Sequence, residues 1–277
     1  MQLEVAHRRA RSFVRHHARM PNRAHEAVVR RSFENQVSLF SGPDSPFAKR
    51  PESSLAWIEP LTPEMLVLDV ACGAAHASEP IAPLVRQIVG VDVTPALLAL
   101  GAARLRDADV RNVLLQEANA EALPFVDESF DLVFCRSSLH HFDDPRQAVA
   151  EMVRVCAPEG RVVLFDLVAP DADRRERFDH VHRLLDPSHV RTFLEAELVE
   201  LMPGGVDTLS YGETFTIRLP IELVCTDQSD RDEIVRLLQA ELRGDAPPTG
   251  FEPVEEDGAI VVSFTTCVVH AERSDPG

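Results

Sequence analysis

Two aspartates in the sequence stand at the ends of short apolar runs that are typical of buried strands. Asp69 belongs to the run 67–70, and Asp92 closes the run 87–92, which places it 92 − 69 = 23 residues later. An acid about 20 residues after the first strand–loop–helix turn is where a ribose-binding carboxylate is expected in nucleotide-binding folds. The pair therefore indicates a site for a nucleotide-like ligand.

The loop that follows Asp69 is built from small residues, Ala71-Cys72-Gly73-Ala74-Ala75. Small side chains let the backbone approach a ligand, and Gly73 can take a positive φ at no steric cost. Ala71 and Ala75 replace glycines of the dinucleotide-binding pattern, which disfavours a pyrophosphate against this turn. A carboxylate beside the loop repels phosphate and suits a cation such as an ammonium or a sulfonium.

Three further side chains are candidates for moving a proton. His140 and His141 follow the strand-like run 130–135, and Asp166 lies at the carboxyl end of the run 161–167. A neutral imidazole accepts protons near pH 7, and a carboxylate can orient it. The alternative is structural: one histidine packs, the other binds backbone, and Asp166 is a capping or solvated acid.

Strand-like and helix-like segments alternate through the first two thirds of the chain. The strands are expected at 67–70, 87–92, 113–116, 130–135 and 161–167, and the helices at 77–86, 94–105 and 145–156. This order predicts right-handed β-α-β units and a parallel sheet.

The flanking segments have a different character. A helix is expected at 25–40, charged helices at 171–202, strands at 214–219 and 259–269, and a helix at 230–243. The histidines at 180, 182 and 189 fall in the charged segment, where a solvent-exposed face is the expectation.

Composition excludes several classes of protein. With 45% hydrophobic residues in 277, the chain can build a sizeable core, and no run is long and apolar enough to span a membrane. The net charge of −17 argues against a nucleic-acid partner. The five cysteines lie far apart, which predicts a reducing, cytoplasmic location without disulfides, and no spacing indicates a metal site.

Five motifs occur together in the order of a known family. They are VLDVACG at 67–73, GVD at 90–92, EALPF at 121–125, SFDLVFCRSSLHHF at 129–142 and GRVV at 160–163. In this, the segment 63–170 resembles the class I S-adenosylmethionine-dependent methyltransferases, in particular the type 11 branch related to ubiquinone and menaquinone biosynthesis.

The resemblance implies an α/β fold. Its Rossmann-like sheet has seven strands with the last one antiparallel, helices on both faces and a helical cover. The expected organisation is an Arg-rich arm at 1–24, a helical cap at 25–62, an S-adenosylmethionine-binding core at 63–170, a substrate-cover insert at 171–210 and completion of the sheet at 211–277.

The resemblance also assigns roles by position. Asp69 would favour the ammonium and sulfonium end of S-adenosylmethionine, and Asp92 would accept hydrogen bonds from the ribose hydroxyls. The remaining contacts would come from Ala71, Cys72 and Gly73 around the methionine part, Val93, Asn119 and Ala120 around the adenine, and Arg136 and Ser137 beneath the methionyl group. Asn119 stands where an aspartate is common, and its amide oxygen can still accept from the adenine amino group.

The resulting hypothesis is methyl transfer from S-adenosylmethionine to a small molecule, either quinone-like or a natural-product phenol or enol. His140, His141 and Asp166 are its candidate catalytic residues. Two alternatives stay open: a non-catalytic cofactor-binding or scaffold protein with the same fold, and an NAD-linked oxidoreductase, which the missing glycines disfavour.

Overall fold

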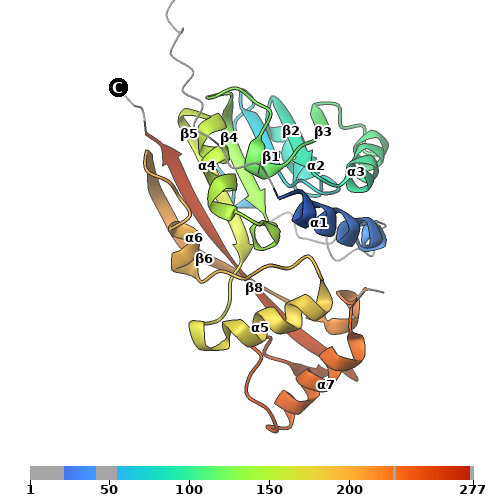
Figure 1. Ribbon diagram of the computed structural model, residues 1–277. Coiled ribbons are helices and arrows are strands. Elements are labelled where there is room, and N and C mark those ends of the chain that lie inside the picture. The colour runs from blue at the N-terminus through green and yellow to red at the C-terminus, as the bar shows by residue number, and fades with distance from the viewer. Residues whose placement is uncertain (1–21, 42–54, 227–228, 275–277) are drawn as a thin grey trace, which may run out of the picture.

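One mixed sheet runs through the molecule. The structure is a computed structural model, which describes residues 22–41, 55–226 and 229–274 (Figure 1). Nearly all of the predicted arm at 1–24, and the part of the predicted cap at 42–54, lie outside these residues. The sheet has the strand order β3-β2-β1-β4-β5-β8-β6, with β7 paired to β8.

The strands agree with the predicted alternation. They are β1 (Leu66–Val70), β2 (Gln87–Asp92), β3 (Val113–Glu117), β4 (Phe130–Arg136), β5 (Cys156–Leu167), β6 (Val206–Pro220), β7 (Val254–Glu256) and β8 (Ala259–Arg273). Strands β1 to β5 are parallel, and β8 is antiparallel to both β5 and β6. The predicted methyltransferase-type sheet, with its last strand antiparallel, is confirmed.

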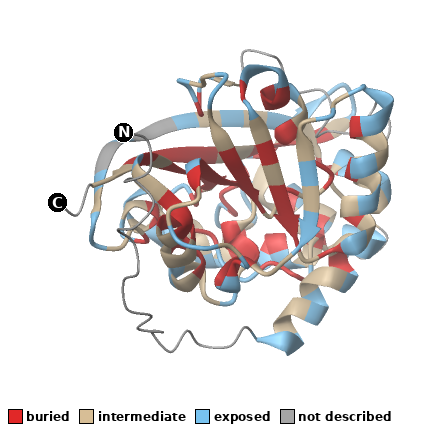
Figure 2. Ribbon diagram, turned by 90° about the horizontal axis from the view of Figure 1, so that it is seen from above, coloured by how far each residue is buried: buried red, intermediate tan, exposed pale blue. Residues whose placement is uncertain are grey.

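Helices cover both faces of the sheet. They are α1 (Arg23–Asn35), α2 (Ser78–Ile81), α3 (Pro95–Asp107), α4 (Pro145–Val155), α5 (Ala172–Leu185), α6 (Glu195–Val199) and α7 (Arg231–Leu242). Successive side chains of a strand point to opposite sides of the sheet, so each central strand contributes to the packing on both faces. Val133 and Leu164 pack with α4 and α6, whereas Phe134 and Val163 pack with α2 and Trp57. The central strands are accordingly buried (Figure 2).

Two predicted helices are shorter than expected. The segment 77–86 forms α2 and then a 3₁₀ turn over Ala82–Leu84. Pro80 and Pro83 explain this, because each lacks the N–H that a longer α-helix would use. The predicted helix 25–40 ends as an α-helix at Asn35 and continues as a 3₁₀ turn over Val37–Phe40.

The sheet is longer and has one strand more than predicted. Strands β6 and β8 pair along their whole lengths, from Val206 with Arg273 to Pro220 with Val261. The pairing of β8 with β5 ends at Thr266, so the antiparallel pair of β6 and β8 extends beyond the carboxyl end of β5. The short strand β7 pairs with this extension and makes the sheet eight-stranded.

The extension carries a second core. Helices α5 and α7 pack on it through an apolar cluster that includes Phe178, Leu238, Phe251 and Val262. Figure 1 shows these two helices at one end of the molecule, beyond the parallel strands. The predicted helical segment 171–202 is therefore two helices, α5 and α6, separated by an irregular stretch at 186–194. Among the described residues, no helix has the length and apolarity to cross a membrane.

Candidate functional site

Asp69 and Asp92 lie at the same end of neighbouring strands. Strands β1 and β2 are paired, with Asp69 opposite Gly90, so both carboxylates reach the carboxyl edge of the sheet. Asp92 Oδ2 accepts a hydrogen bond from the Gly73 backbone N–H at 2.9 Å, and its Oδ1 accepts from the Thr94 N–H at 2.8 Å. Asp92 thus holds the small-residue loop and the Thr94 backbone, which precedes the first residue of α3. Burial raises the pKa of its carboxyl group above the usual value.

The loop after β1 has positive φ angles at three residues, two of which are alanines. Ala71 has a φ of 58°, Gly73 of 53° and Ala75 of 60°. A left-handed backbone conformation costs an alanine roughly 1–2 kcal/mol, so the backbone of this turn is strained at Ala71 and Ala75. Gly90 makes room for it, because a Cβ there would lie 2.9 Å from the Cys72 sulfur.

Asp69 is buried, and no salt bridge to it is found within the described part of the chain. Its Oδ2 accepts a hydrogen bond from the Ser78 hydroxyl at 2.6 Å, and 2% of the residue is exposed. Desolvation raises the pKa of Asp69 to about 7, against the opposing effects of the Ser78 hydrogen bond and the Arg136 charge. A cationic ligand beside this carboxylate would favour its ionised form.

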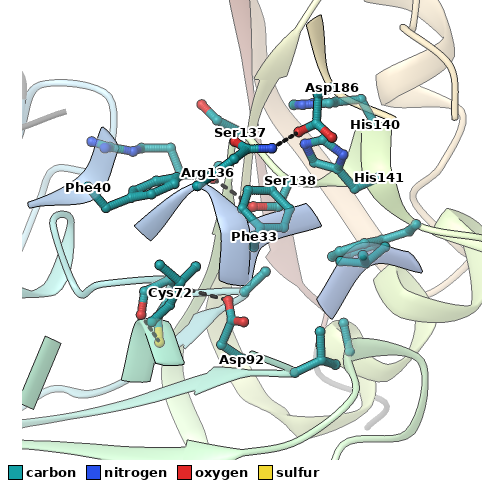
Figure 3. A pocket seen from close by; sticks show the side chains of 18 of the residues that line it. Phe33, Phe40, Cys72, Asp92, Arg136, Ser137, Ser138, His140, His141 and Asp186 are labelled. Carbon is teal, nitrogen blue, oxygen red and sulfur yellow. Dashed lines mark hydrogen bonds between the residues drawn. The ribbon is translucent and has the colours of Figure 1, made fainter. Parts of the chain in front are cut away.

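These residues line one cavity of about 300 Å³. All ten predicted cofactor-binding residues contribute to its wall, as do His140 and His141. Figure 3 shows Cys72 and Asp92 at one end of the cavity and His140, His141 and Asp186 toward the other. Asp166 does not line it, since it is fully buried behind His140.

Helix α1 closes the side of the cavity near the predicted adenine position. The Asn119 amide donates from Nδ2 to Glu26 at 2.9 Å, and its Oδ1 accepts from the Glu121 N–H at 2.8 Å. Arg30 contacts Glu117 at the end of β3 at 2.7 Å. Both the amide nitrogen and the amide oxygen of Asn119 therefore take part in hydrogen bonds within the protein. The hydrogen bond from the nitrogen to Glu26 holds α1 in place.

His140 and Asp166 form a buried pair. His140 Nδ1 lies 2.5 Å from Asp166 Oδ1, while Asp166 Oδ2 accepts from the backbone N–H groups of Ser138 and Leu139. The imidazole and these hydrogen bonds lower the pKa of Asp166 despite its burial. The carboxylate therefore fixes a proton on Nδ1, which leaves Nε2 as the basic nitrogen of His140.

His141 has different partners. The Ser188 hydroxyl donates to Asp186 at 2.7 Å and lies 3.0 Å from His141 Nδ1, which leaves His141 as the donor in that contact. Burial and the neighbouring His140 lower the pKa of His141 to about 3. His141 is therefore a poor base, and the two predicted histidines are not equivalent.

The expectation that His182 and His189 are solvent-exposed is wrong. Only 7% of His182 and 4% of His189 is exposed, whereas His180 is exposed as expected. The signal was present in the sequence: Phe178, Val181, His182 and Leu185 follow the i, i+3, i+4, i+7 spacing of one helix face. All four are buried.

The remaining wall was not identified from the sequence. Its apolar part comes largely from the second half of the chain, with Leu167, Leu185, Ile217, Leu219, Leu223, Val224 and Phe264 as its main members. These residues lie at the ends of β5 and α5, on the extension formed by β6 and β8, and in the turn after β6. No local motif marks them, because only the pairing of β6 with β8 brings them to the cavity.

Comparison with known proteins places this geometry in a family. Residues 68–164 match the family model described as a methyltransferase domain. Residues 68–164 are therefore a methyltransferase domain. The resemblance predicted from the five motifs is confirmed.

The relatives extend the match beyond that domain. The chain is similar to the uncharacterized methyltransferase YcgJ of Bacillus subtilis, with 38% identity over 160 residues, covering 57% of this chain and 62% of YcgJ. It is 37% identical over 108 residues to the demethylmenaquinone methyltransferase of Renibacterium salmoninarum, covering 39% and 44% of the two chains. The matched segments thus span less than two thirds of these relatives.

A solved structure covers more of the fold. The protein BH2331 of Bacillus halodurans C-125, described as a methyltransferase, superposes with a TM-score of 0.72 at 27% identity. The alignment covers 81% of this chain and 99% of that one. The architecture that this chain shares with BH2331 therefore extends well beyond the matched domain.

Proposed function

We propose that this methyltransferase transfers the methyl group of S-adenosylmethionine to a hydroxyl oxygen of an apolar small molecule, a phenol or an enol. The observation that carries the proposal is the His140–Asp166 pair, whose histidine lines the same cavity as Asp69 and Asp92. One end of that cavity suits a cationic adenosyl compound, and the other offers a base for an acidic hydroxyl.

The first end fits S-adenosylmethionine on chemical grounds. Asp69 is a buried carboxyl whose ionised form lacks a bound cation, and an ammonium or sulfonium supplies one. Asp92 uses its two oxygens for backbone N–H groups, and each oxygen keeps a lone pair for a ribose hydroxyl. The positive-φ turn brings backbone rather than side chains to the ligand.

The chemistry at the second end is proton removal. S-adenosylmethionine supplies a methyl group already activated on a positively charged sulfur. His140 Nε2 takes the proton of the acceptor hydroxyl, the oxygen bonds to the methyl carbon, and the carbon–sulfur bond breaks with its electrons remaining on sulfur. The Asp166 carboxylate stabilises the imidazolium that forms, and the proton then passes to water.

The chain's other contribution is alignment in a dry site. Helix α1 lies over the cavity through Glu26 and Phe33, and the apolar wall encloses the acceptor side. Holding oxygen, methyl and sulfur in line while excluding water is where most of the rate enhancement of such a transfer arises.

A labelled-methyl assay tests the proposal. S-adenosylmethionine with a radiolabelled methyl group is incubated with a panel of phenolic, quinone-like and amine acceptors, using wild type, His140→Phe, His141→Phe and His180→Phe. We expect transfer to phenolic or enolic acceptors that falls at least a hundredfold in His140→Phe, because general-base catalysis contributes about 10²–10⁴. His180 is exposed on α5, so its variant should keep the wild-type rate.

The outcomes separate the proposal from its alternatives. Labelling of amines only, or full activity in His140→Phe, would remove the proton-acceptor role. Tight binding of S-adenosylmethionine with no transfer to any acceptor would favour the non-catalytic alternative. A small-molecule partner rather than nucleic acid, and a cytoplasmic location, stay predictions from the sequence.

A further inference from the structure

We propose that His182 binds a second oxygen of the acceptor, so that the acceptor is an uncharged phenol or enol with oxygens on adjacent carbons. This inference rests on the proposed function and specifies its substrate class. His182 lies on α5, in a segment that shares no motif with the cofactor-binding core, and its ring forms part of the cavity wall.

The His182 ring has an unused hydrogen-bonding capacity. Its Nδ1 is buried and has no hydrogen-bond partner in the described part of the chain. A buried N–H without a partner is costlier than an unshared lone pair, so the proton belongs on the other nitrogen, Nε2. Since the ring lines the cavity and Nδ1 is fully covered, Nε2 is the nitrogen that faces it. His182 is therefore a hydrogen-bond donor toward the ligand.

An aromatic cage holds this donor rigidly. The His182 ring stacks on His189 at a centroid distance of 4.7 Å and meets Phe178, Phe251 and Phe264 at 4.8, 5.2 and 5.7 Å. His189 is fixed in turn by Asp179, whose Oδ1 lies 2.8 Å from its Nε2. A side chain supported in this way can hold a ligand atom in a defined place.

The same surroundings keep His182 neutral. Burial, reinforced by the nearby imidazoles, lowers its pKa well below the usual value. A neutral donor suits a carbonyl or hydroxyl oxygen and gives no advantage to a carboxylate or phosphate. The neighbouring wall residues Leu185, Ile217, Leu223 and Phe264 are apolar and disfavour a charged acceptor in the same way.

His140 and His182 are close enough to serve one acceptor. Their ring centroids are 6.4 Å apart. His140 accepts a proton through Nε2, whereas His182 donates a hydrogen bond and keeps its proton. Two hydrogen bonds of about 2.8 Å can therefore join this pair to neighbouring oxygens on one ring, a hydroxyl that loses its proton and an oxygen beside it. Adjacent-carbon diols, hydroxyketones and hydroxyquinones share this arrangement.

Three naphthalene probes test the inference. Isothermal titration calorimetry measures the affinity of the protein saturated with S-adenosylhomocysteine for 2,3-dihydroxynaphthalene, 2,7-dihydroxynaphthalene and 2-naphthol. We expect the 2,3-compound to bind about tenfold more tightly than the other two. His182→Phe, which keeps the aromatic packing and removes the donor, should abolish this preference, and His182→Leu serves as a second variant. His180→Phe, the same change on the exposed side of α5, should preserve it.

Equal affinity of the wild type for the three probes would overturn the inference, and so would a preference that survives in both His182 variants. The proposed function is judged separately, by transfer of labelled methyl to the same compounds. Transfer with no preference for adjacent oxygens contradicts the inference alone. A His182-dependent preference in binding supports the inference, whether or not methyl transfer follows.

Discussion

Asp69 is the residue whose charge state links ligand binding to pH. Its pKa of about 7 in the folded protein lies above the ordinary value of 3.8 because burial disfavours the ionised form. A raised carboxyl pKa stabilises the fold below about pH 4, and this contribution is lost as the pH rises through 7. A cationic ligand has the opposite preference, because it binds the ionised carboxylate.

S-adenosylmethionine should therefore bind more tightly as the pH rises from 5.5 to 8. We expect the affinity to level off above pH 7 and the binding to release a proton below it, because the ligand's charge lowers the pKa of Asp69. Calorimetry in buffers of different ionisation enthalpy measures that proton. Asp69→Asn should bind more weakly and lose the dependence; an unchanged pH profile in this variant would assign the effect to another group.

The strained turn makes a prediction about stability. Ala71→Gly should raise the free energy of unfolding by about 1 kcal/mol, because glycine adopts the positive φ of this position without a Cβ clash. Ala74 has no positive φ, and Ala74→Gly should lower that free energy by a similar amount. Urea denaturation compares the two. A loss of stability in Ala71→Gly would show that the alanine backbone is unstrained.

Single residues also show where the sequence was informative. Asp69 and Asp92 could be placed together because strand ends and loop composition are local signals, and parallel strands bring their carboxyl ends to one edge. His182 was misread because the charged composition of its segment outweighed the helical spacing of its apolar face. Ser188 and Asp186 gave no signal, since their role depends on α1 packing against a turn some 150 residues away.

At the scale of elements, α1 is held over the cavity at both of its ends. Near the N-terminal end, Glu26 accepts a hydrogen bond from Asn119. Near the C-terminal end, Ser32 and Gln36 donate hydrogen bonds to Asp186 at 2.7 and 3.0 Å. These donors, with His141 and Ser188, lower the pKa of Asp186 well below the usual range. The carboxylate thus joins the helix to the turn that supports His141.

Weakening this attachment should speed ligand release. We expect Gln36→Leu to raise the dissociation rate of S-adenosylhomocysteine about tenfold, because a hydrogen bond to a charged group is worth roughly 1.5–3 kcal/mol and 1.4 kcal/mol is a factor of ten. Glu34→Leu, on the exposed side of the same helix, is the matched control. Stopped-flow displacement gives both rates, and identical rates would mean that α1 does not cover the bound ligand.

Elements were predictable to different degrees for physical reasons. The strands β1 to β5 have strong local patterns, and the sequence locates them within a few residues. The length of the α-helix at 77–86 was overestimated, although Pro80 and Pro83 in the sequence indicate a shorter one. Strands β6 and β8 were predicted too short, since residues 206–213 and 270–273 were missed. These residues lie where β8 pairs with both β5 and β6, and local periodicity does not report that pairing.

At the scale of the whole molecule, two apolar cores share one pair of strands. β6 and β8 run from the parallel sheet into the extension under α5 and α7, so the backbone hydrogen bonds of both halves belong to one ladder. Trp57, the single tryptophan, is buried in the first core against Phe134 and Phe165. Phe251 is buried in the second. This arrangement predicts one cooperative unit.

Phe251→Ala should destabilise both cores together. Removing a buried phenylalanine lowers the free energy of unfolding by about 3–5 kcal/mol. The urea midpoint should therefore fall, and the decrease should be the same by Trp57 fluorescence and by far-UV circular dichroism. Fluorescence reports on the core that the substitution does not touch. A midpoint unchanged by fluorescence but lowered by dichroism would mean that the extension unfolds independently.

We expect S-adenosylmethionine to bind in the cavity at the carboxyl ends of β1 and β2, and the proposed function depends on this expectation. Its most direct test is calorimetric titration of the wild type, Asp92→Ala and the exposed-acid control Asp107→Ala with S-adenosylmethionine, S-adenosylhomocysteine and NAD. We predict binding of both adenosyl sulfur compounds and not of NAD, with affinity at least tenfold weaker in Asp92→Ala and unchanged in Asp107→Ala. Binding of NAD in preference to both compounds, or full affinity in Asp92→Ala, would contradict the account.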